Sequence, residues 1–497
     1  MLAALIVWAP LPLGSNRPWA WALLESAIFL AGLLWLTGYA RRETVPGSVP
    51  RAAWPALALL ALWLLYLFVQ WLPMPAPWVR LLSPQAAALH AGVDYLWPGR
   101  LVTLSIDPHA SFVFWLKSCA YALAFVLTLL LVHGRARLTW LCLAIVASGV
   151  LQAYYGSLMH LMKLDFEVLG MPIQHSAQAS GGYVNRNHLA GLLEMSLAVG
   201  IGLMIGQLED RPRRNWREFA HDLAVLLISR KAILRLLLVI MVVALVMTRS
   251  RMGNTAFVAS LLVAGVVALA LSRRTPRATV ILIASLIVVD IAVIGTWFGV
   301  ERTFKRIAET TAQQVEERVD PSVYAVKIFE DYPLFGTGGG TFYTAFTRYR
   351  GHDIDAYYDH LHNDYVQFLT ETGIIGGSLA GLLVLASFAC AILAQSRRRD
   401  PLARGVAFGV VMGVTAIGIH STVDFNLQIP ANAMTFVFVL SLGWIARYAA
   451  RGVTSPPGRS DRLPRRSEQR GCQFRRRSDP KTHHTRESMG SAVSDNT

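Results

Sequence analysis

The sequence predicts an all-α polytopic membrane protein with about twelve transmembrane helices and one large loop outside the membrane. Two features of the whole chain support this fold class. Hydrophobic residues make up 54% of the 497 residues and charged residues only 15%, and the mean hydropathy is +0.43. The apolar residues are also grouped in long uncharged blocks, as membrane-spanning helices require. Together these features exclude an ordinary soluble globular protein.

The apolar blocks give twelve candidate spans. They cover residues 2–13, 19–39, 53–72, 111–132, 138–160, 188–208, 232–247, 255–271, 279–298, 373–394, 402–420 and 431–445. The first block is short for a span of about 20 residues, so we expect either a partial helix or a chain start further upstream. It lacks a positive segment and a small-residue cleavage site, which does not favour a secretory signal.

The distribution of basic residues fixes the orientation of these spans. Basic clusters occur at residues 41–42, 135–137, 211–235, 273–277 and 397–399, and in the tail. Each cluster follows an even-numbered span, and short loops rich in Lys and Arg remain in the cytoplasm. We therefore expect both chain ends in the cytoplasm and the long loop 299–372 on the outer face.

The chain is strongly basic, with a net charge of +15. A basic tail can bind nucleic acid, but beside many spans it is more typical of the cytoplasmic membrane surface, so we predict no nucleic-acid partner. The tail has no apolar periodicity and is expected to be disordered. The four cysteines show no disulfide framework and no CxxC metal motif.

The outer loop contains the best candidate for a catalytic base. His360 and His362 lie just before an apolar helix, and Asp364 and Gln367 have the spacing of a capping box. The positive end of a helix disfavours imidazolium, so we expect His362 to be neutral and able to accept a proton. The alternative is an ordinary solvated loop histidine.

Three arginines on the outer side suggest an anionic substrate. Arg249 and Arg251 lie in a tight turn between spans, and Arg318 lies in the long loop. The guanidinium group presents a planar set of donors that suits phosphate oxygens. For Arg249 the alternative is a snorkelling residue at the end of a span.

Three weaker patterns have other interpretations. Asp353, Asp355 and Asp359 with the nearby histidines resemble a metal site, but such short patterns arise by chance in acidic loops. Residues 336–340, Gly-Thr-Gly-Gly-Gly, resemble a phosphate cradle, although a flexible turn is the simpler reading. Isolated ionisable residues inside predicted spans can mark a transport path; they are Lys117, Glu194 and Asp290.

The chain resembles the O-antigen ligase and polymerase family of bacterial envelope enzymes. The most specific match is His362-Asn363 followed by Gly373-x-x-Gly376, similar to the histidine motif in the large periplasmic loop of the family. Four further segments match, in the family's order: Gly181 to Ala190 with Asn185 and Asn187; Thr248-Arg249-Ser250-Arg251; Arg318 with the segment from Pro333 to Gly338, where Ser322 replaces the usual Trp; and Asp424 to Ala433.

The resemblance implies a GT-C-like membrane glycosyltransferase in the bacterial inner membrane, with its active site facing the periplasm. Such an enzyme moves a glycan from an undecaprenyl diphosphate carrier to an acceptor hydroxyl, on lipid A core or on a growing polysaccharide. His362 would be the catalytic base, and Arg251, Arg318 and Arg249 would bind the diphosphate. The resemblance also implies supporting roles for five other residues: Asn363, Gly373, Gly376, Asn187 and Asp424. The resemblance implies an inverting reaction with no metal and no cofactor.

This interpretation divides the chain into three parts. Residues 1–139 hold N-terminal transmembrane helices, residues 140–445 form the ligase-like core with loop 299–372, and residues 446–497 form the basic cytoplasmic tail. The motifs do not distinguish a ligase from a polymerase or a protein oligosaccharyltransferase. The alternative from another class is a transporter or flippase for a polysaccharide or lipid precursor.

Overall fold

The computed structural model describes residues 1–43, 49–94, 99, 101–163, 166–168, 171–173, 178–207, 230–271, 312–352, 354 and 357–449. Contacts group the described residues into one compact unit within residues 1–452. The predicted span 279–298 and the basic tail lie outside the described residues. The division at residues 139 and 445 stays a prediction.

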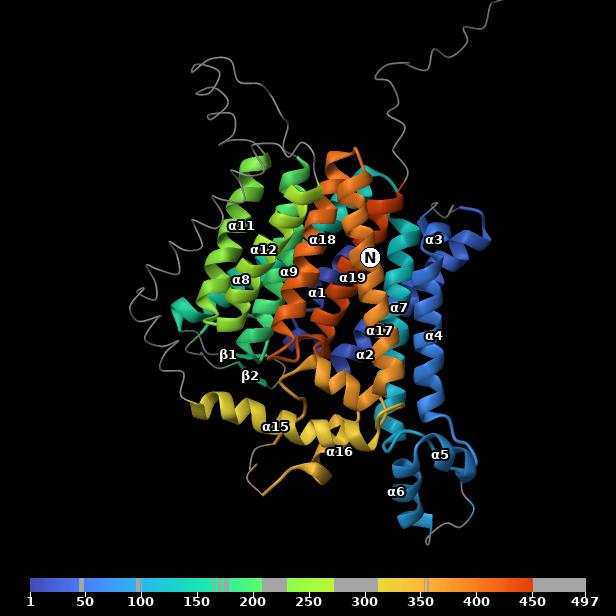
Figure 1. Cartoon of the computed structure of the whole chain (residues 1–497). Coiled ribbons are helices and arrows are strands. Elements are labelled where there is room, and N and C mark those ends of the chain that lie inside the picture. Colours follow the sequence, from blue (N-terminus) through green and yellow to red (C-terminus); the bar gives the residue numbers. More distant parts are fainter. Residues whose placement is uncertain are drawn as a thin grey trace, which may run out of the picture. The chain divides into compact units, whose positions relative to one another are not determined.

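Helices form nearly all of the regular structure (Figure 1). In chain order the α-helices are α1 (Leu2–Trp8), α2 (Pro18–Ala40), α3 (Val49–Ala52), α4 (Trp54–Trp71), α5 (Ala76–Leu82), α6 (Pro84–Asp94), α7 (Pro108–Leu131), α8 (Arg135–Met162), α9 (Arg186–Gly206), α11 (Arg230–Met247), α12 (Arg251–Leu271), α15 (Ala312–Asp331), α16 (Phe342–Tyr349), α17 (Asp364–Arg397), α18 (Pro401–His420) and α19 (Pro430–Tyr448). Short 3-10 helices cover Leu13–Ser15 and Asn426–Gln428, and the strands β1 (Phe166–Val168) and β2 (Met171–Ile173) pair antiparallel.

Eight described helices are long and apolar enough to cross a membrane: α2, α4, α7, α8, α9, α12, α17 and α18. The all-α multi-pass fold is therefore confirmed, whereas the count of twelve spans is not. Helix α1 has seven residues, which span about 10 Å and cannot cross a hydrocarbon core of about 30 Å. The apolar part of α11, Ala232–Met247, is shorter than the other spans.

Helices α9 and α18 form the centre of the bundle, because both are buried along most of their length. Small residues let their backbones approach closely. A Cβ on Gly202 would lie 2.9 Å from the backbone nitrogen of Gly409, and a Cβ on Gly405 would lie 2.7 Å from the Cα of Gly206. Close glycine contacts of this kind are typical of helix pairs in membranes.

The connections on one end of the bundle form a separate structure, which we call the cap: the described residues of 73–107 and 321–363. The cap contains α5, α6, the C-terminal part of α15, and α16, all at the lower end in Figure 1. It has its own small hydrophobic core, to which Val79, Leu104, Ile328 and Phe346 contribute. The described part of loop 299–372 therefore packs against the connection between α4 and α7 on one end, as the predicted alternation of spans requires.

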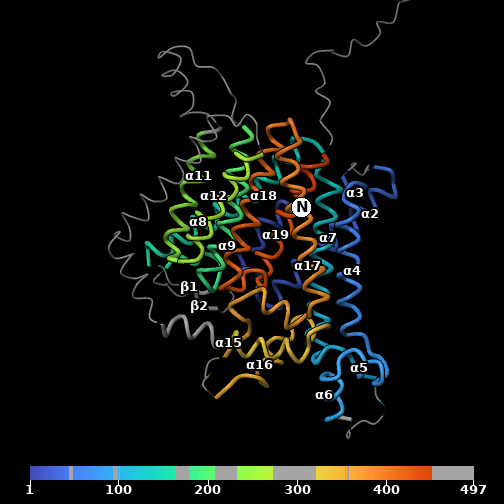
Figure 2. Tube along the Cα trace, viewed as in Figure 1, coloured from blue at the N-terminus to red at the C-terminus, as the bar shows by residue number. Residues whose placement is uncertain are grey.

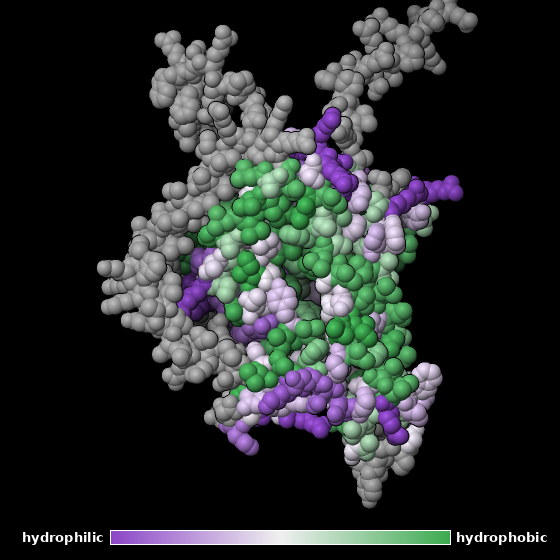
Figure 3. Space-filling view, in the orientation of Figure 1, coloured by the Kyte–Doolittle hydropathy of each residue, from purple (hydrophilic) through white to green (hydrophobic). Residues whose placement is uncertain are grey.

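The opposite end carries the basic connections. Arg135, at the start of α8, pairs with Asp400 before α18, and Arg398 donates a hydrogen bond to the backbone oxygen of Ala449 (2.6 Å) after α19. Hydrophilic residues gather at the two ends of the visible surface, with a hydrophobic band between them (Figure 3). Helices α4, α7 and α17 run side by side along this band (Figure 2). This is the surface pattern of a multi-pass membrane protein.

Candidate active site

His362 and Asp424 meet at the cap end of the bundle. His362 lies two residues before α17, and Asp424 lies in the connection from α18 to α19. The Nδ1 of His362 is 3.2 Å from the Oδ1 of Asp424. The histidine side chain is 28% exposed, whereas the aspartate is fully buried. With its Nδ1–H donated to the carboxylate, His362 presents Nε2 as the free basic atom.

The surroundings of Asp424 favour its ionised form. Burial alone would raise the pKa of this carboxyl, but the hydrogen bond from His362 and the charges of His188, His420 and His362 hold the pKa of Asp424 well below its usual range. Oδ1 also accepts the backbone N–H of Phe425 (3.0 Å). Asp424 therefore acts as a fixed anion behind the imidazole of His362.

Phe425 packs against three of these imidazole rings. Its ring centroid lies 5.0 Å from that of His362, 5.1 Å from that of His360 and 4.6 Å from that of His188. Burial, followed by the charges of Lys117, His188 and the neighbouring His362, lowers the pKa of His360 to about 3. His360 is therefore neutral near pH 7, and its Nδ1 accepts a hydrogen bond from Gln367 Nε2 (3.0 Å).

The start of α17 is anchored on the connection that carries Asp424. Asn363 is the N-cap, and its Oδ1 accepts the backbone N–H of Val366 (3.1 Å). Asp364 is buried, and its Oδ2 accepts hydrogen bonds from Ser421 Oγ (2.7 Å) and the Leu427 N–H (3.1 Å). The predicted capping box of Asp364 and Gln367 is therefore wrong: the N-cap is Asn363. Asp364 instead connects the start of α17 to the segment between α18 and α19.

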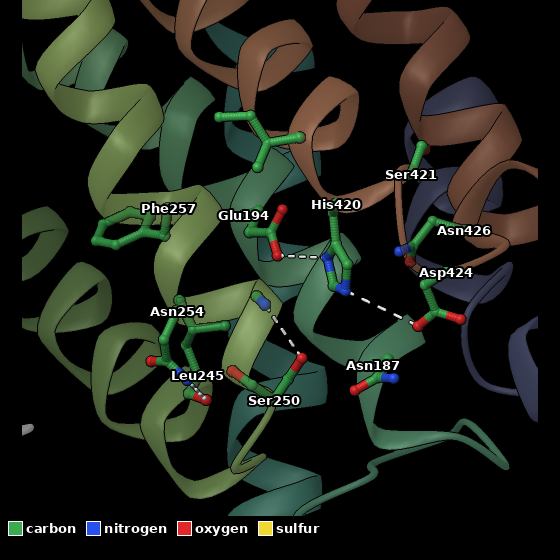
Figure 4. A network of polar contacts seen from close by, with 12 residues as sticks. Asn187, Glu194, Leu245, Ser250, Asn254, Phe257, His420, Ser421, Asp424 and Asn426 are labelled. Carbon is green, nitrogen blue, oxygen red and sulfur yellow. Dashed lines mark hydrogen bonds and ion pairs between the residues drawn. The ribbon is translucent and has the colours of Figure 1, made fainter. Parts of the chain in front are cut away.

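The Asn-x-Asn segment supports the same connection from α9. Asn185 caps α9 through the backbone N–H of Asn187 (2.9 Å), and the Asn187 side chain is among the residues drawn around Asp424 (Figure 4). Asn432 donates hydrogen bonds to the backbone oxygen of His188 (2.9 Å) and to Asn426 Oδ1 (3.0 Å). Two of the segments that carry the family resemblance are thus in direct contact.

The turn with Arg249 and Arg251 lies beside a buried pair, Glu194 and His420. Ser250 Oγ accepts the N–H of Gly253 (3.1 Å) in the first turn of α12, which begins at Arg251. A Cβ on Gly253 would lie 3.1 Å from Glu194 Oε1, so this helix start packs closely on α9. Glu194 Oε1 in turn accepts Nδ1–H of His420 (2.8 Å; Figure 4). Both arginines are exposed.

Arg318 lies on α15, which packs against α16 and α17. Its side chain is outside the described residues, so its role stays a prediction. Asp353 and Asp355 are also outside them. Within the part of the chain that the structure describes, no group of three or more His, Cys, Asp or Glu side chains is arranged to hold a metal ion.

The glycine-rich turn, residues 336–340, is packed against its surroundings, whereas the sequence suggested a flexible turn on the outer face. Residues 336–339 are buried. The turn holds a carboxylate of the protein itself: Glu371 accepts the N–H groups of Gly340 (3.1 Å) and Phe342 (3.2 Å). Gln70 from α4 donates to the Phe335 oxygen (2.7 Å) and accepts the Gly339 N–H (3.1 Å).

Gly373 and Gly376 serve this packing. Gly373 interrupts α17 with φ +60° and ψ −172°, a conformation open almost only to glycine. A Cβ on Gly376 would lie 2.7 Å from Cε1 of Tyr66. Both glycines therefore have a structural role at the junction of α17 and the cap.

Residues 236–381 match the family model described as O-antigen ligase. The chain carries an O-antigen ligase family region. This match supports the predicted relationship to the ligase and polymerase family and indicates membrane glycan transfer of that type. A comparison with curated proteins finds no match.

The O-antigen ligase region contains most of the predicted site. It runs from α11 to the middle of α17 and includes Arg249, Arg251, Arg318, His362 and both motif glycines. Asn187 and Asp424 lie outside this region in sequence, and the packing of the helices brings them to the site.

Sequence reasoning missed three contributors to this site: His420, Glu371 and Gln70. All three are at most 1% exposed and lie in helices that are otherwise largely apolar. For Gln70 and Glu371, the signal available in the sequence was a polar residue within an otherwise apolar helix. Of the predicted intramembrane ionisable groups, Glu194 pairs with His420 and the Lys117 ammonium lies 3.7 Å from the Trp21 ring centroid; Asp290 is outside the described residues.

Proposed function

We propose that this protein is an inverting, metal-independent glycosyltransferase that moves a glycan from an undecaprenyl diphosphate carrier to an acceptor hydroxyl. The acceptor is lipid A core or a growing polysaccharide, as in an O-antigen ligase or polymerase. The observation that carries the proposal is the contact of His362 Nδ1 with the buried Asp424 (3.2 Å) inside a chain with an O-antigen ligase region.

The chemistry starts with the base. His362 Nε2 removes the proton of the acceptor hydroxyl as the oxygen attacks the anomeric carbon. The bond from that carbon to the carrier diphosphate breaks, and the diphosphate leaves with the electron pair. Attack from the opposite face inverts the anomeric centre. Asp424 orients the ring and stabilises the imidazolium that forms, and such a base contributes about 10²- to 10⁴-fold in rate.

The diphosphate needs positive charge, which the arginines supply. Arg249 and Arg251 lie exposed where α12 begins, and the positive end of a helix dipole also attracts anions. Arg318 would complete the clamp from α15. Guanidinium groups held in place before the reaction stabilise the charge that develops on the leaving group. They take the part that a divalent ion plays in other transferases.

The proposed location is the bacterial inner membrane, with the cap and the active site in the periplasm. The basic connections at the opposite end support this orientation, because short basic loops stay in the cytoplasm. A GT-C-like arrangement of the helices is part of the same proposal.

The test is transfer by the purified protein in proteoliposomes, with an undecaprenyl diphosphate-linked glycan, lipid A core or lipid-linked repeats as acceptors, and product mass as the readout. We expect product with the natural protein, at an unchanged rate in excess EDTA. His362→Ala should lower the rate by at least about 100-fold. His109→Gln, which changes an exposed histidine at the start of α7, is the matched control. Full activity of His362→Ala would refute the base assignment.

A further inference from the structure

His420 lies between two buried carboxylates: Glu194, which the proposed reaction does not use, and Asp424, which holds His362. Its Nδ1 is 2.8 Å from Glu194 Oε1, and its Nε2 is 3.8 Å from Asp424 Oδ2. All three side chains are completely buried. Figure 4 shows the ring between the two acids, which come from α9 and from the connection after α18.

This geometry suits a ring that is protonated on both nitrogens. The Nδ1–H is donated to Glu194. If the ring were neutral, Nε2 would direct a lone pair at the carboxylate of Asp424. Within the described part of the chain, neither His420 Nε2 nor Asp424 Oδ2 has a hydrogen-bond partner, so the two atoms face each other only as an ion pair. Two buried anions so close together also need a cation between them.

Further titratable groups from three other segments lie near the His420 ring. From α9, His188 Nε2 faces Asp424 Oδ1 at 3.8 Å. From α17, Asp364 contributes a further carboxyl, and His362 lies on the other side of Asp424. The start of α12 brings Ser250 and Gly253 to the pair, with Arg251 at its first position. Acidic groups thus adjoin His420 on three elements.

We propose that His420 is a positioning residue, which carries a positive charge between Glu194 and Asp424 and thereby tunes the basicity of His362. The positive charge of His420 opposes protonation of His362, since both cations interact with the same carboxylate. Removal of this charge should therefore make the loss of transfer activity on acidification begin at higher pH. The inference rests on the proposed function of His362.

The experiment is the pH dependence of kcat/KM for transfer by the natural protein, His420→Gln, Glu194→Gln and the double variant. The acid limb of the pH profile is the range in which kcat/KM falls as the pH decreases. In His420→Gln this limb should move to higher pH by about one unit, because the opposing charge is gone. At a pH below the limb, kcat/KM of the variant should be about tenfold lower than that of the natural protein, and above the limb the two values should agree to within about twofold.

Glu194→Gln should move the limb in the same direction, because His420 loses the anion that stabilises its proton. The double variant should then show no larger shift than His420→Gln, since both changes remove one charge. A purely structural role would lower activity equally at all pH values.

The matched control is His90→Gln, which removes a half-buried histidine that hydrogen bonds to the Thr103 oxygen in the cap (3.0 Å). It should leave the limb in place. A limb that does not move in His420→Gln, in protein that is active and folded by size-exclusion chromatography, would overturn the inference. Inactivity of the natural protein itself would instead count against the proposed function. If His420→Gln does not fold, Glu194→Gln alone decides by the same criterion.

Discussion

Gly336 and Gly373 contact each other so closely that a Cβ on Gly373 would lie 2.7 Å from the backbone nitrogen of Gly336. The contact has a consequence for helix α17. After the kink at Gly373, the N–H of Ile374 donates to the oxygen of Pro333 (2.8 Å) instead of to a helical carbonyl. The Pro-x-x-Gly-x-Gly segment and the Gly-x-x-Gly segment are therefore two halves of one junction, which fixes the cap and His362 on the bundle.

This junction predicts a large effect of Gly373→Ala. Alanine is strained at φ +60° and would also collide with the Leu334 oxygen, so we expect a loss of at least about 3 kcal/mol in the free energy of unfolding. Thermal unfolding in detergent measures it. Gly381→Ala in the same helix is the control, since a Cβ there meets nothing within 4 Å, and should change stability by less than about 1 kcal/mol. Equal stabilities of the two variants would contradict this account.

The sequence predicted the fold class well because hydropathy and charge alternation are local signals. Blocks of apolar residues correspond to helices, and the basic connections lie together at one end. The predicted number of spans was wrong where an apolar block was barely long enough to cross the membrane. An example is α1, which ends at Trp8 just before two prolines. Nor could the pattern predict that the glycine-rich turn is buried and hydrogen bonded, since Glu371 and Gln70 reach it from distant helices.

The site was predictable only where a motif marks it. His362, Asn363 and Asp424 were predicted, and the structure brings them together at one end of α17. His420 was missed because a histidine at the end of an apolar helix has no local pattern; its meaning comes from Glu194, 226 residues away in sequence. Long-range pairs of this kind depend on helix packing, which periodicity does not encode.

The arginine clamp predicts a difference between the two substrates. Arg251→Ala and Arg318→Ala should each raise the KM for the lipid-linked donor by about tenfold, because a charge-assisted hydrogen bond to phosphate is worth about 1.5–3 kcal/mol. The KM for the acceptor should change by less than about twofold. Initial rates with each substrate varied in turn measure both values.

The control for the clamp is Arg350→Ala, which removes an exposed arginine after α16 that has no part in the proposed site. It should leave both KM values unchanged. If Arg251→Ala and Arg318→Ala affect the acceptor as much as the donor, the arginines do not hold the diphosphate.

His360 predicts an acid sensitivity of the fold. Its pKa is about 3 in the folded protein, below the value of about 6.5 for an unfolded histidine. Between these values the unfolded chain binds a proton that the folded protein does not, so stability falls as the pH drops below about 6.5. From pH 7.5 to pH 5 this costs about 2 kcal/mol.

His360→Gln should remove most of this loss, so its thermal unfolding should depend less on pH between 7.5 and 5. His109→Gln, at an exposed position, should keep the pH dependence of the natural protein. A variant at position 360 with the natural pH dependence would show that another group is responsible.

The proposed orientation predicts which positions a membrane-impermeant thiol reagent can reach from the periplasm. In a background without the four native cysteines, Tyr357→Cys should be labelled in spheroplasts, since Tyr357 is 67% exposed in the cap. Ser396→Cys, exposed at the basic end of α17, should be labelled only after the membrane is permeabilised. The reverse pattern would place His362 on the cytoplasmic side, where the proposed reaction could not use a periplasmic acceptor. Labelling therefore tests the location of the site independently of any assay of transfer.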